Sequence, residues 1–153
     1  MAKQSAGILL YRKTKDILEV FLVHPGGPFF KNKDEGAWSI PKGEFELDEN
    51  SLTAAKREFE EETGKILDGE FIALNPVKQK GGKTVLAWAI AGEIDPETIK
   101  SNTFEIEWPP RSGKKQTFPE IDRGAWFDIN MAKVKINPAQ VALLEELSQL
   151  TAQ

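Results

Sequence analysis

The chain has 153 residues, of which 40% are hydrophobic and 29% are charged, and its formal net charge is −4. This length and composition predict a single globular domain that spans residues 1–153. Because the chain contains no cysteine, a disulfide framework and a thiol nucleophile are excluded. The acidic balance argues against an extended face for binding nucleic acid.

The N-terminal part of the sequence predicts no membrane partner. The apolar run of residues 6–10 is too short for a membrane span or for the core of a secretion signal. We therefore expect a cytoplasmic protein.

The first elements along the chain are expected to be strands. Residues 5–11 and 18–24 are apolar runs separated by a polar turn, and the Pro-Gly-Gly-Pro sequence at 25–28 ends the second run. Residues 38–40 predict a short strand, which Pro41 ends. His24 is the only histidine of the chain, and at the end of an apolar strand we interpret it as a structural residue.

A helix is expected to follow and to end at Gly64. The side chain of Asn50 or Ser51 can cap its N-terminus, and a glycine readily adopts the left-handed conformation that stops a helix. The apolar stripe of this helix consists of Leu52, Ala55 and Phe59.

The second half of the chain predicts further strands and a closing helix. Residues 71–78 and 84–91 are expected to pair around a Gly-Gly turn, and residues 124–127 form another short strand. Asn137 and Pro138 have the residue types preferred at the start of a helix. The apolar stripe of this last helix consists of Leu143, Leu144, Leu147 and Leu150, with Val141 at its margin.

Three carboxylates stand out within the predicted helix that ends at Gly64. Glu58, Glu61 and Glu62 are spaced so that a helix places them on one face, where like charges repel. A divalent cation between them would remove that repulsion. Oxygen ligands rich in carboxylates are the type that Mg²⁺ or Mn²⁺ prefers, and Mg²⁺ often shares its site with substrate phosphates.

The whole stretch of residues 43–64 resembles the signature box of the Nudix hydrolases, which cleave nucleoside diphosphates linked to another group. Gly43, Glu49, Arg57 and Gly64 accompany the three carboxylates at the offsets of that motif. One departure is Lys65, at a position where the family usually has an apolar residue. The resemblance implies an α/β/α sandwich with a mixed central sheet, Mg²⁺ or Mn²⁺ as cofactor, and a nucleotide polyphosphate as substrate.

The resemblance also implies roles for individual residues. Glu58, Glu61 and Glu62 are expected to bind the metal, with the carbonyl oxygen of Lys42 as a further ligand. Arg57 and Glu49 are expected to form a supporting pair that orients the site.

Two residues remain candidates for the general base. Glu58 is one, and Glu120 is the other because its segment resembles one that faces the box in many Nudix proteins, where a glutamate binds metal or activates water. Asp122 is a weaker substitute for Glu120. An exposed loop glutamate without a role is the plain alternative for Glu120.

Residues 104–118 are interpreted as a loop that carries substrate-binding groups. Arg111, Lys114 and Lys115 can neutralise a polyphosphate, and Trp108 can stack on a base. The alternative is a solvated loop whose tryptophan packs on the domain. The side chain of Lys42 can also meet a phosphate, and the same potential exists in the earlier loop, which carries Phe29, Phe30, Lys31 and Lys33.

These observations predict metal-dependent hydrolysis of a pyrophosphate bond, most consistent with a (di)nucleoside polyphosphate substrate. Two alternatives stay open. An RNA 5′-end pyrophosphohydrolase would need an extended basic track, which the net charge disfavours. A nucleotide-sensing binding module would be expected to have lost a carboxylate of the box, and this sequence retains them all.

Overall fold

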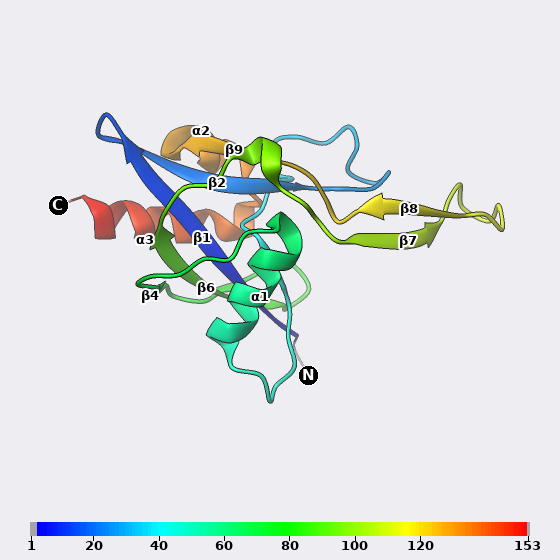
Figure 1. Cartoon of the computed structure of the whole chain (residues 1–153), viewed down its shortest axis with the longest axis horizontal. Coiled ribbons are helices and arrows are strands. Elements are labelled where there is room, and N and C mark those ends of the chain that lie inside the picture. Colours follow the sequence, from blue (N-terminus) through cyan, green and yellow to red (C-terminus); the bar gives the residue numbers. More distant parts are fainter. Residues whose placement is uncertain (1–2, 153) are drawn as a thin grey trace.

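A computed structural model describes residues 3–152 and shows a central sheet covered by helices on both faces (Figure 1). The strands are β1 (Gln4–Thr14), β2 (Ile17–Pro25), β3 (Lys42–Glu44), β4 (Ile72–Ala73), β5 (Val77–Lys78), β6 (Thr84–Ala91), β7 (Thr103–Glu107), β8 (Lys115–Pro119) and β9 (Ile121–Asp128). The helices are α1 (Ser51–Thr63), α2 (Ile129–Lys135) and α3 (Val141–Thr151), with short 3₁₀ helices η1 (Pro96–Thr98) and η2 (Pro138–Gln140).

The central sheet has seven strands in a mixed arrangement. Its main order is β4-β6-β1-β2-β9, while β3 pairs with β1 and β5 pairs with β6. The β1–β6 pair is parallel, and the other pairs of this sheet are antiparallel. The first half of β1 pairs with β3 and the second half with β2, so β3 fills the space where β2 diverges from β1.

Alternation along the buried strands creates two cores, one on each face of the sheet. On β1, Ile8 and Leu10 belong to the core under α1, while Leu9 belongs to the core under α2 and α3. On β2, Phe21 faces α1 and Leu22 faces the other side. Successive strand residues point to opposite faces, so a continuous apolar run indicates burial on both faces. The predicted α/β/α sandwich is confirmed.

The helix that carries the acidic residues begins and ends as the sequence predicts. The side chain of Asn50 accepts a hydrogen bond from the backbone N–H of Thr53 at 3.0 Å, which identifies Asn50 as the N-cap. Gly64 ends α1 in the left-handed conformation, with φ of 83°, and its N–H donates to the carbonyl of Glu60. Ala55 and Phe59 are fully buried, whereas the predicted stripe residue Leu52 is only half-buried.

Several elements differ from the sequence prediction. Residues 38–40 make only isolated bridges, to Val23 and Ile136, and residues 71–78 divide into β4 and β5. The last helix begins as η2, with Asn137 as its N-cap, and continues as α3, on which Leu150 is exposed rather than buried. Helix α2 was not predicted, because its seven residues contain a single buried position, Ala132.

The largest difference concerns residues 104–118, which form a hairpin instead of a loop. Strands β7 and β8 pair with each other from Thr103–Pro119 at the base to Glu107–Lys115 near the tip. They form a separate two-stranded sheet that projects from the body of the molecule (Figure 1). No helix within residues 3–152 has the length and apolar character needed to cross a membrane.

A buried glutamine fixes the segment that leads into β3. Gln140 is fully buried, and its side-chain oxygen accepts a hydrogen bond from the backbone N–H of Ile40 at 3.1 Å. Its amide donates to the hydroxyl of Ser39 at 3.1 Å and to the side-chain oxygen of Gln79 at 2.8 Å. One side chain thus joins the end of η2, the segment before β3 and the loop between β5 and β6.

Replacing this glutamine should destabilise the fold. Gln140→Leu keeps the volume but leaves the buried N–H of Ile40 unpaired, so the free energy of unfolding should fall by about 1–3 kcal/mol. Urea denaturation followed by circular dichroism measures the change. Gln149→Leu, at an exposed position of α3, is the matched control and should change stability by no more than about 0.5 kcal/mol. Equal losses in both variants would contradict the role assigned to Gln140.

Candidate active site

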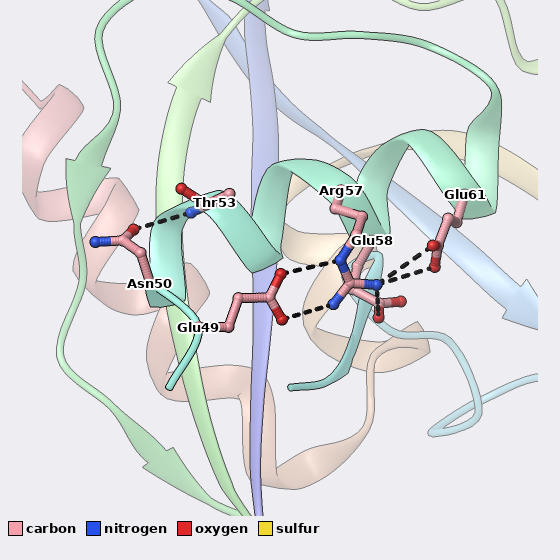
Figure 2. A network of polar contacts seen from close by, with 6 residues as sticks. All are labelled: Glu49, Asn50, Thr53, Arg57, Glu58 and Glu61. Carbon is pink, nitrogen blue, oxygen red and sulfur yellow. Dashed lines mark hydrogen bonds and ion pairs between the residues drawn. The ribbon is translucent and has the colours of Figure 1, made fainter. Parts of the chain in front are cut away.

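Arg57 lies at the centre of a network of carboxylates on one face of α1 (Figure 2). Its Nε and Nη2 donate to the two oxygens of Glu49 at 3.1 and 3.0 Å, a bidentate contact from the loop before the helix. Its Nη1 donates to Glu58 at 3.0 Å and to Glu61 at 3.3 Å. The expected Arg57–Glu49 pair therefore forms, and the same guanidinium also holds two of the clustered carboxylates.

The carboxylates around Arg57 stabilise its charged form. Hydrogen bonding from Glu49 and the nearby charge of Glu58 raise the pKa of Arg57 against the opposing effect of burial. Burial and the charge of Glu61 raise the pKa of Glu58, although Arg57 opposes this shift. One guanidinium is thus not sufficient to neutralise the whole acidic face.

Gly43 explains how the strand before the helix approaches so closely. A Cβ atom at this position would overlap the carboxylate of Glu58. Gly43 lies on β3, where it pairs with Ala6 of β1. Gly43 lets β3 lie directly against this carboxylate in the orientation that Arg57 holds, which gives a structural reason for the glycine of the motif.

Glu62 is the most deeply buried carboxylate of the cluster. Its exposed fraction is 8%, and burial together with the charge of Glu58 raises its pKa to about 8. Lys42 lies beside it on β3, and burial and the charge of Lys83 lower the pKa of Lys42. Lys83 itself is paired with Glu44 at 3.1 Å. Lys42 therefore lies next to the acidic face, and the nearby charge of Lys83 disfavours the charged form of Lys42.

Glu120 reaches this site through a series of backbone hydrogen bonds. The N–H of Asn102 donates to the carbonyl of Glu61 at 3.0 Å, and the carbonyl of Asn102 accepts from the N–H of Glu120 at 2.8 Å. The carbonyl of Glu120 accepts in turn from the N–H of Gly26 at 2.8 Å. Residues far apart in the chain thus place Glu120 beside the C-terminal turn of α1.

A small cavity joins Glu120 to the buried part of the cluster. Its volume is about 180 Å³, and Lys42, Glu62 and Glu120 are among the residues that line it, together with Ser39 and Ile121. The charge of Glu120 contributes to the raised pKa values of both Glu58 and Glu62. The structure therefore brings the predicted Glu120 together with the carboxylates of α1.

The donor groups at this site suit a hard divalent cation. Carboxylate oxygens from α1 and from Glu120, with the backbone of Lys42 beside them, are the ligands that Mg²⁺ and Mn²⁺ prefer. Within residues 3–152, no three Asp, Glu or His side chains are already arranged to hold a metal ion. Arg57 engages Glu58 and Glu61 in this arrangement, so these two side chains would have to turn toward a cation.

The predicted basic residues lie at the far end of the β7–β8 hairpin. Arg111 and Lys114 belong to its tip, and Lys115 pairs with Glu105 at 3.8 Å on the exposed surface. Lys115 and Pro119 are the two ends of the five-residue strand β8, about 13 Å apart at ~3.3 Å per residue step. These cations are therefore not adjacent to the acidic face. Trp108 packs edge-on against Phe29, with ring centroids 5.4 Å apart.

His24 and Asp122 form a pair that sequence reasoning did not identify. The His24 ring is fully buried, with Nδ1 at 2.9 Å from Asp122 Oδ1 and Nε2 at 2.6 Å from the carbonyl oxygen of Lys33. This confirms that His24 has a structural position. It also shows that Asp122 is directed toward His24, whereas Glu120 faces the cavity with Glu62. The only signal in the sequence was a histidine at the end of an apolar strand.

Comparisons with known proteins extend this description. A family model described as the NUDIX domain matches residues 1–147. A search of curated proteins found no match. Among solved structures, the Ap4A hydrolase of C. elegans in a binary complex is 22% identical, covers 99% of this chain and 98% of its own, and superposes with a TM-score of 0.64.

Two other solved structures are similarly related. The NUDIX domain of Shewanella oneidensis NrtR, complexed with ADP ribose, is 14% identical over 100% of this chain and 90% of its own, with a TM-score of 0.65. A mutT/nudix family protein from Listeria innocua is 17% identical over 98% of this chain and 94% of its own, with a TM-score of 0.63. At these identities the likeness shows the fold alone.

The family match covers nearly the whole chain, and the motif residues stand in one connected network around Arg57. Nudix hydrolases generally use a divalent metal and cleave the pyrophosphate bond of nucleoside diphosphate derivatives. This chain belongs to the Nudix family and is a pyrophosphohydrolase that acts on phosphoric anhydrides.

Proposed function

We propose that this enzyme hydrolyses a (di)nucleoside polyphosphate and uses Mg²⁺ or Mn²⁺ as its cation. The observation that carries the proposal is the acidic face of α1, which lies beside Glu120 and Lys42. Carboxylates for a metal and cations for phosphates thus lie at one place, joined by the cavity that Lys42, Glu62 and Glu120 line.

Different residues of the chain have different roles at the bond that is cleaved. Glu58, Glu61 and Glu62, with the carbonyl of Lys42, would hold the cation. When bound, the cation supplies charge neutralisation on the phosphate oxygens and lowers the pKa of a coordinated water. Arg57 orients the acidic face from within, because its planar fork fixes Glu49, Glu58 and Glu61 at once.

Glu120 is the better candidate for the general base. Glu58 already accepts a hydrogen bond from Arg57 at 3.0 Å. Glu120 has an exposed side chain without a hydrogen-bond or ion-pair partner among residues 3–152, so it is available to accept a proton from water.

Two groups of cations are proposed to meet the phosphates. The side chain of Lys42, with Lys83 beside it, contacts the phosphates at the cleavage site, where an anion would relieve the repulsion between the two lysines. Arg111, Lys114 and Lys115 meet a more distant part of the substrate. Because the hairpin separates these groups, only a long substrate reaches both, which supports a dinucleoside polyphosphate. The fold shared with the C. elegans Ap4A hydrolase is consistent with this choice.

The basic surface is too short for an RNA track. Three cations at the hairpin tip and a net charge of −4 offer few contacts for an extended chain of phosphates. A cytoplasmic location is proposed, since cysteine is absent and nucleotide polyphosphates are cytoplasmic metabolites.

Turnover should depend on the buried carboxylate. Glu62→Gln keeps the volume and removes a charged metal ligand, so turnover in Mg²⁺ should fall by about a hundredfold or more. Glu60→Gln, at an exposed position of the same helix, should retain near-normal turnover. Release of nucleotide products at saturating Mg²⁺ measures both. A Glu62→Gln enzyme as fast as the control would remove this residue from the metal site.

Without metal, the stability of the protein should fall as the pH rises. The pKa of Glu62 is about 8 in the folded protein against 4.5 ordinarily, so between these values the folded state holds a proton that the unfolded chain has released. The stabilisation is complete below pH 4.5 and is lost as the pH rises through 8. In EDTA, the free energy of unfolding of Glu62→Gln should decrease less steeply over this window than that of wild type. Glu60→Gln should follow wild type, and parallel curves for all three proteins would contradict the burial effect.

Substrate length should determine the importance of the hairpin tip. Changing Arg111, Lys114 and Lys115 together to Ala should lower kcat/KM for a dinucleoside tetraphosphate by about tenfold or more. A single hydrogen bond to a charged group is worth ~1.5–3 kcal/mol, and ~1.4 kcal/mol corresponds to a factor of ten. A nucleoside diphosphate sugar has a shorter phosphate chain for these cations to neutralise and is the internal control. Equal losses on both substrates, or a wild-type preference for the sugar nucleotide, would contradict the long-substrate proposal.

A further inference from the structure

A second and larger cavity lies between the β7–β8 hairpin and the loop that follows β2. Its volume is about 520 Å³, and the residues that line it include Lys31, Trp108, Gln116, Phe118, Pro119 and Asp122. This aromatic cavity has a size typical of small-molecule sites. Its walls come from the hairpin and from the loop, two segments that sequence reasoning treated as separate loops.

The aromatic walls are held in place by their neighbours. Trp108 packs edge-on against Phe29, and Phe118 packs against Phe104 with ring centroids 6.1 Å apart. The side-chain amide of Gln116 donates to the carbonyl of Trp108 at 3.0 Å, and the N–H of Trp108 donates to the carbonyl of Lys114 at 2.9 Å. Flat aromatic groups fixed in this way form a surface on which a nucleobase can stack.

One carboxylate faces this cavity, and a buried side chain orients it. Asp122 Oδ1 lies 2.9 Å from His24 Nδ1, and the side chain of Asp122 is 33% exposed. His24 cannot turn away, because its Nε2 contacts the carbonyl of Lys33 and its ring packs edge-on against Trp38 with centroids 5.3 Å apart. The second carboxylate oxygen has no partner among residues 3–152.

The aromatic cavity adjoins the cleavage site along one short segment of chain. Pro119 and Asp122 line the aromatic cavity, whereas Glu120 and Ile121 line the smaller cavity with Glu62. The N–H of Gly26 donates to the carbonyl of Glu120, and a Cβ at Gly26 would overlap the carbonyl of Pro119. The loop after β2 is therefore held tightly against this segment. A nucleoside in one cavity can place its phosphates in the other.

The carboxylate determines which base such a cavity favours. Guanine presents two adjacent N–H donors, at N1 and at the 2-amino group, and both suit a carboxylate that accepts hydrogen bonds. Adenine presents one amino group next to N1, whose lone pair repels a carboxylate. The ammonium group of Lys31 also suits the O6 acceptor of guanine. We propose that the aromatic cavity binds the nucleobase of the substrate and that Asp122, positioned by His24, selects guanine. This inference rests on the proposed nucleotide substrate.

Binding without turnover tests the proposal directly. The full chain in EDTA is titrated with GMP and with AMP by isothermal calorimetry, so the phosphate is the same in both ligands and only the base differs. Wild type should bind GMP about tenfold or more tightly than AMP, the discrimination expected of a bidentate base contact. Equal affinities, or tighter binding of AMP, would overturn the assignment of guanine.

Asp122→Asn changes the hydrogen-bonding groups that face the base without changing the shape of the side chain. An asparagine offers one acceptor and one donor, a pattern that adenine matches. The GMP preference should therefore fall by about tenfold or more and move toward AMP. Asp68→Asn is the matched control, because Asp68 is exposed and accepts only a local bond from Gly69. An unchanged preference in Asp122→Asn would overturn the role of Asp122.

A second variant tests the cavity independently of Asp122. Trp108→Ala should weaken the binding of GMP and of AMP by a similar factor, because stacking does not distinguish the bases. The ratio of the two affinities should therefore stay the same. Unchanged affinities for both ligands would place the base elsewhere and overturn the proposal. Thermal denaturation of each variant verifies that it is folded.

Turnover measurements on the same proteins distinguish a failure of the base site from a failure of the proposed function. Turnover of guanosine and adenosine dinucleoside tetraphosphates in Mg²⁺ is measured in parallel. An enzyme that binds GMP selectively but cleaves neither substrate would refute the polyphosphate proposal and retain the base site. An enzyme that cleaves both substrates but binds GMP no more tightly than AMP would refute the base site and retain the polyphosphate proposal.

Discussion

The contact between Arg57 and three carboxylates is the interaction on which the site depends. Carboxylates spaced along one face of a helix repel, and burial raises that cost. A single guanidinium reduces it by donating to Glu49 on one side and to Glu58 and Glu61 on the other. Arginine suits this role because its donors are fixed in one plane, so each hydrogen bond restrains the others. Lysine at the same position would offer a point charge without that geometry.

The rest of the fold brings oxygen atoms and cations to this acidic face from distant parts of the chain. Strand β3 can approach because Gly43 has no side chain, and Gln140 anchors the segment before it through the N–H of Ile40. Backbone hydrogen bonds of Asn102 to Glu61 and to Glu120 hold Glu120 beside α1. The contacts of Gln140 and Asn102 satisfy polar backbone groups that would otherwise be unpaired. The same bonds that complete the fold therefore position the functional groups.

The sequence was sufficient for features that depend on local chemistry. An N-cap at Asn50 or Ser51, the C-terminal stop at Gly64 and the apolar strands at 5–11 and 18–24 follow from residues close together in the chain. The structure confirms the strands and the stop, and it identifies Asn50 as the cap. Features that depend on distant partners could not be predicted. The pairing of β7 with β8 is one, since the exposed hairpin has few buried residues to reveal its period. The His24–Asp122 contact joins residues 98 positions apart, and no local pattern indicates it.

The segment from Pro119 to Asp122 separates two environments that favour different chemistry. On one side, the buried Glu62 and the exposed Glu120 meet Lys42 in a small cavity, so charged groups are concentrated there. On the other side, Trp108 and Phe118 form a mostly apolar surface with a single oriented carboxylate. In a regular strand, Glu120 and Asp122 would lie on one face. The pairing of β2 with β9 is interrupted between His24 and Pro25, and such a bulge redirects side chains, so Glu120 lines the first cavity and Asp122 the second. Substrate choice can thus change through the hairpin and its facing loop, while the box on α1 keeps the carboxylates that the hydrolytic reaction requires.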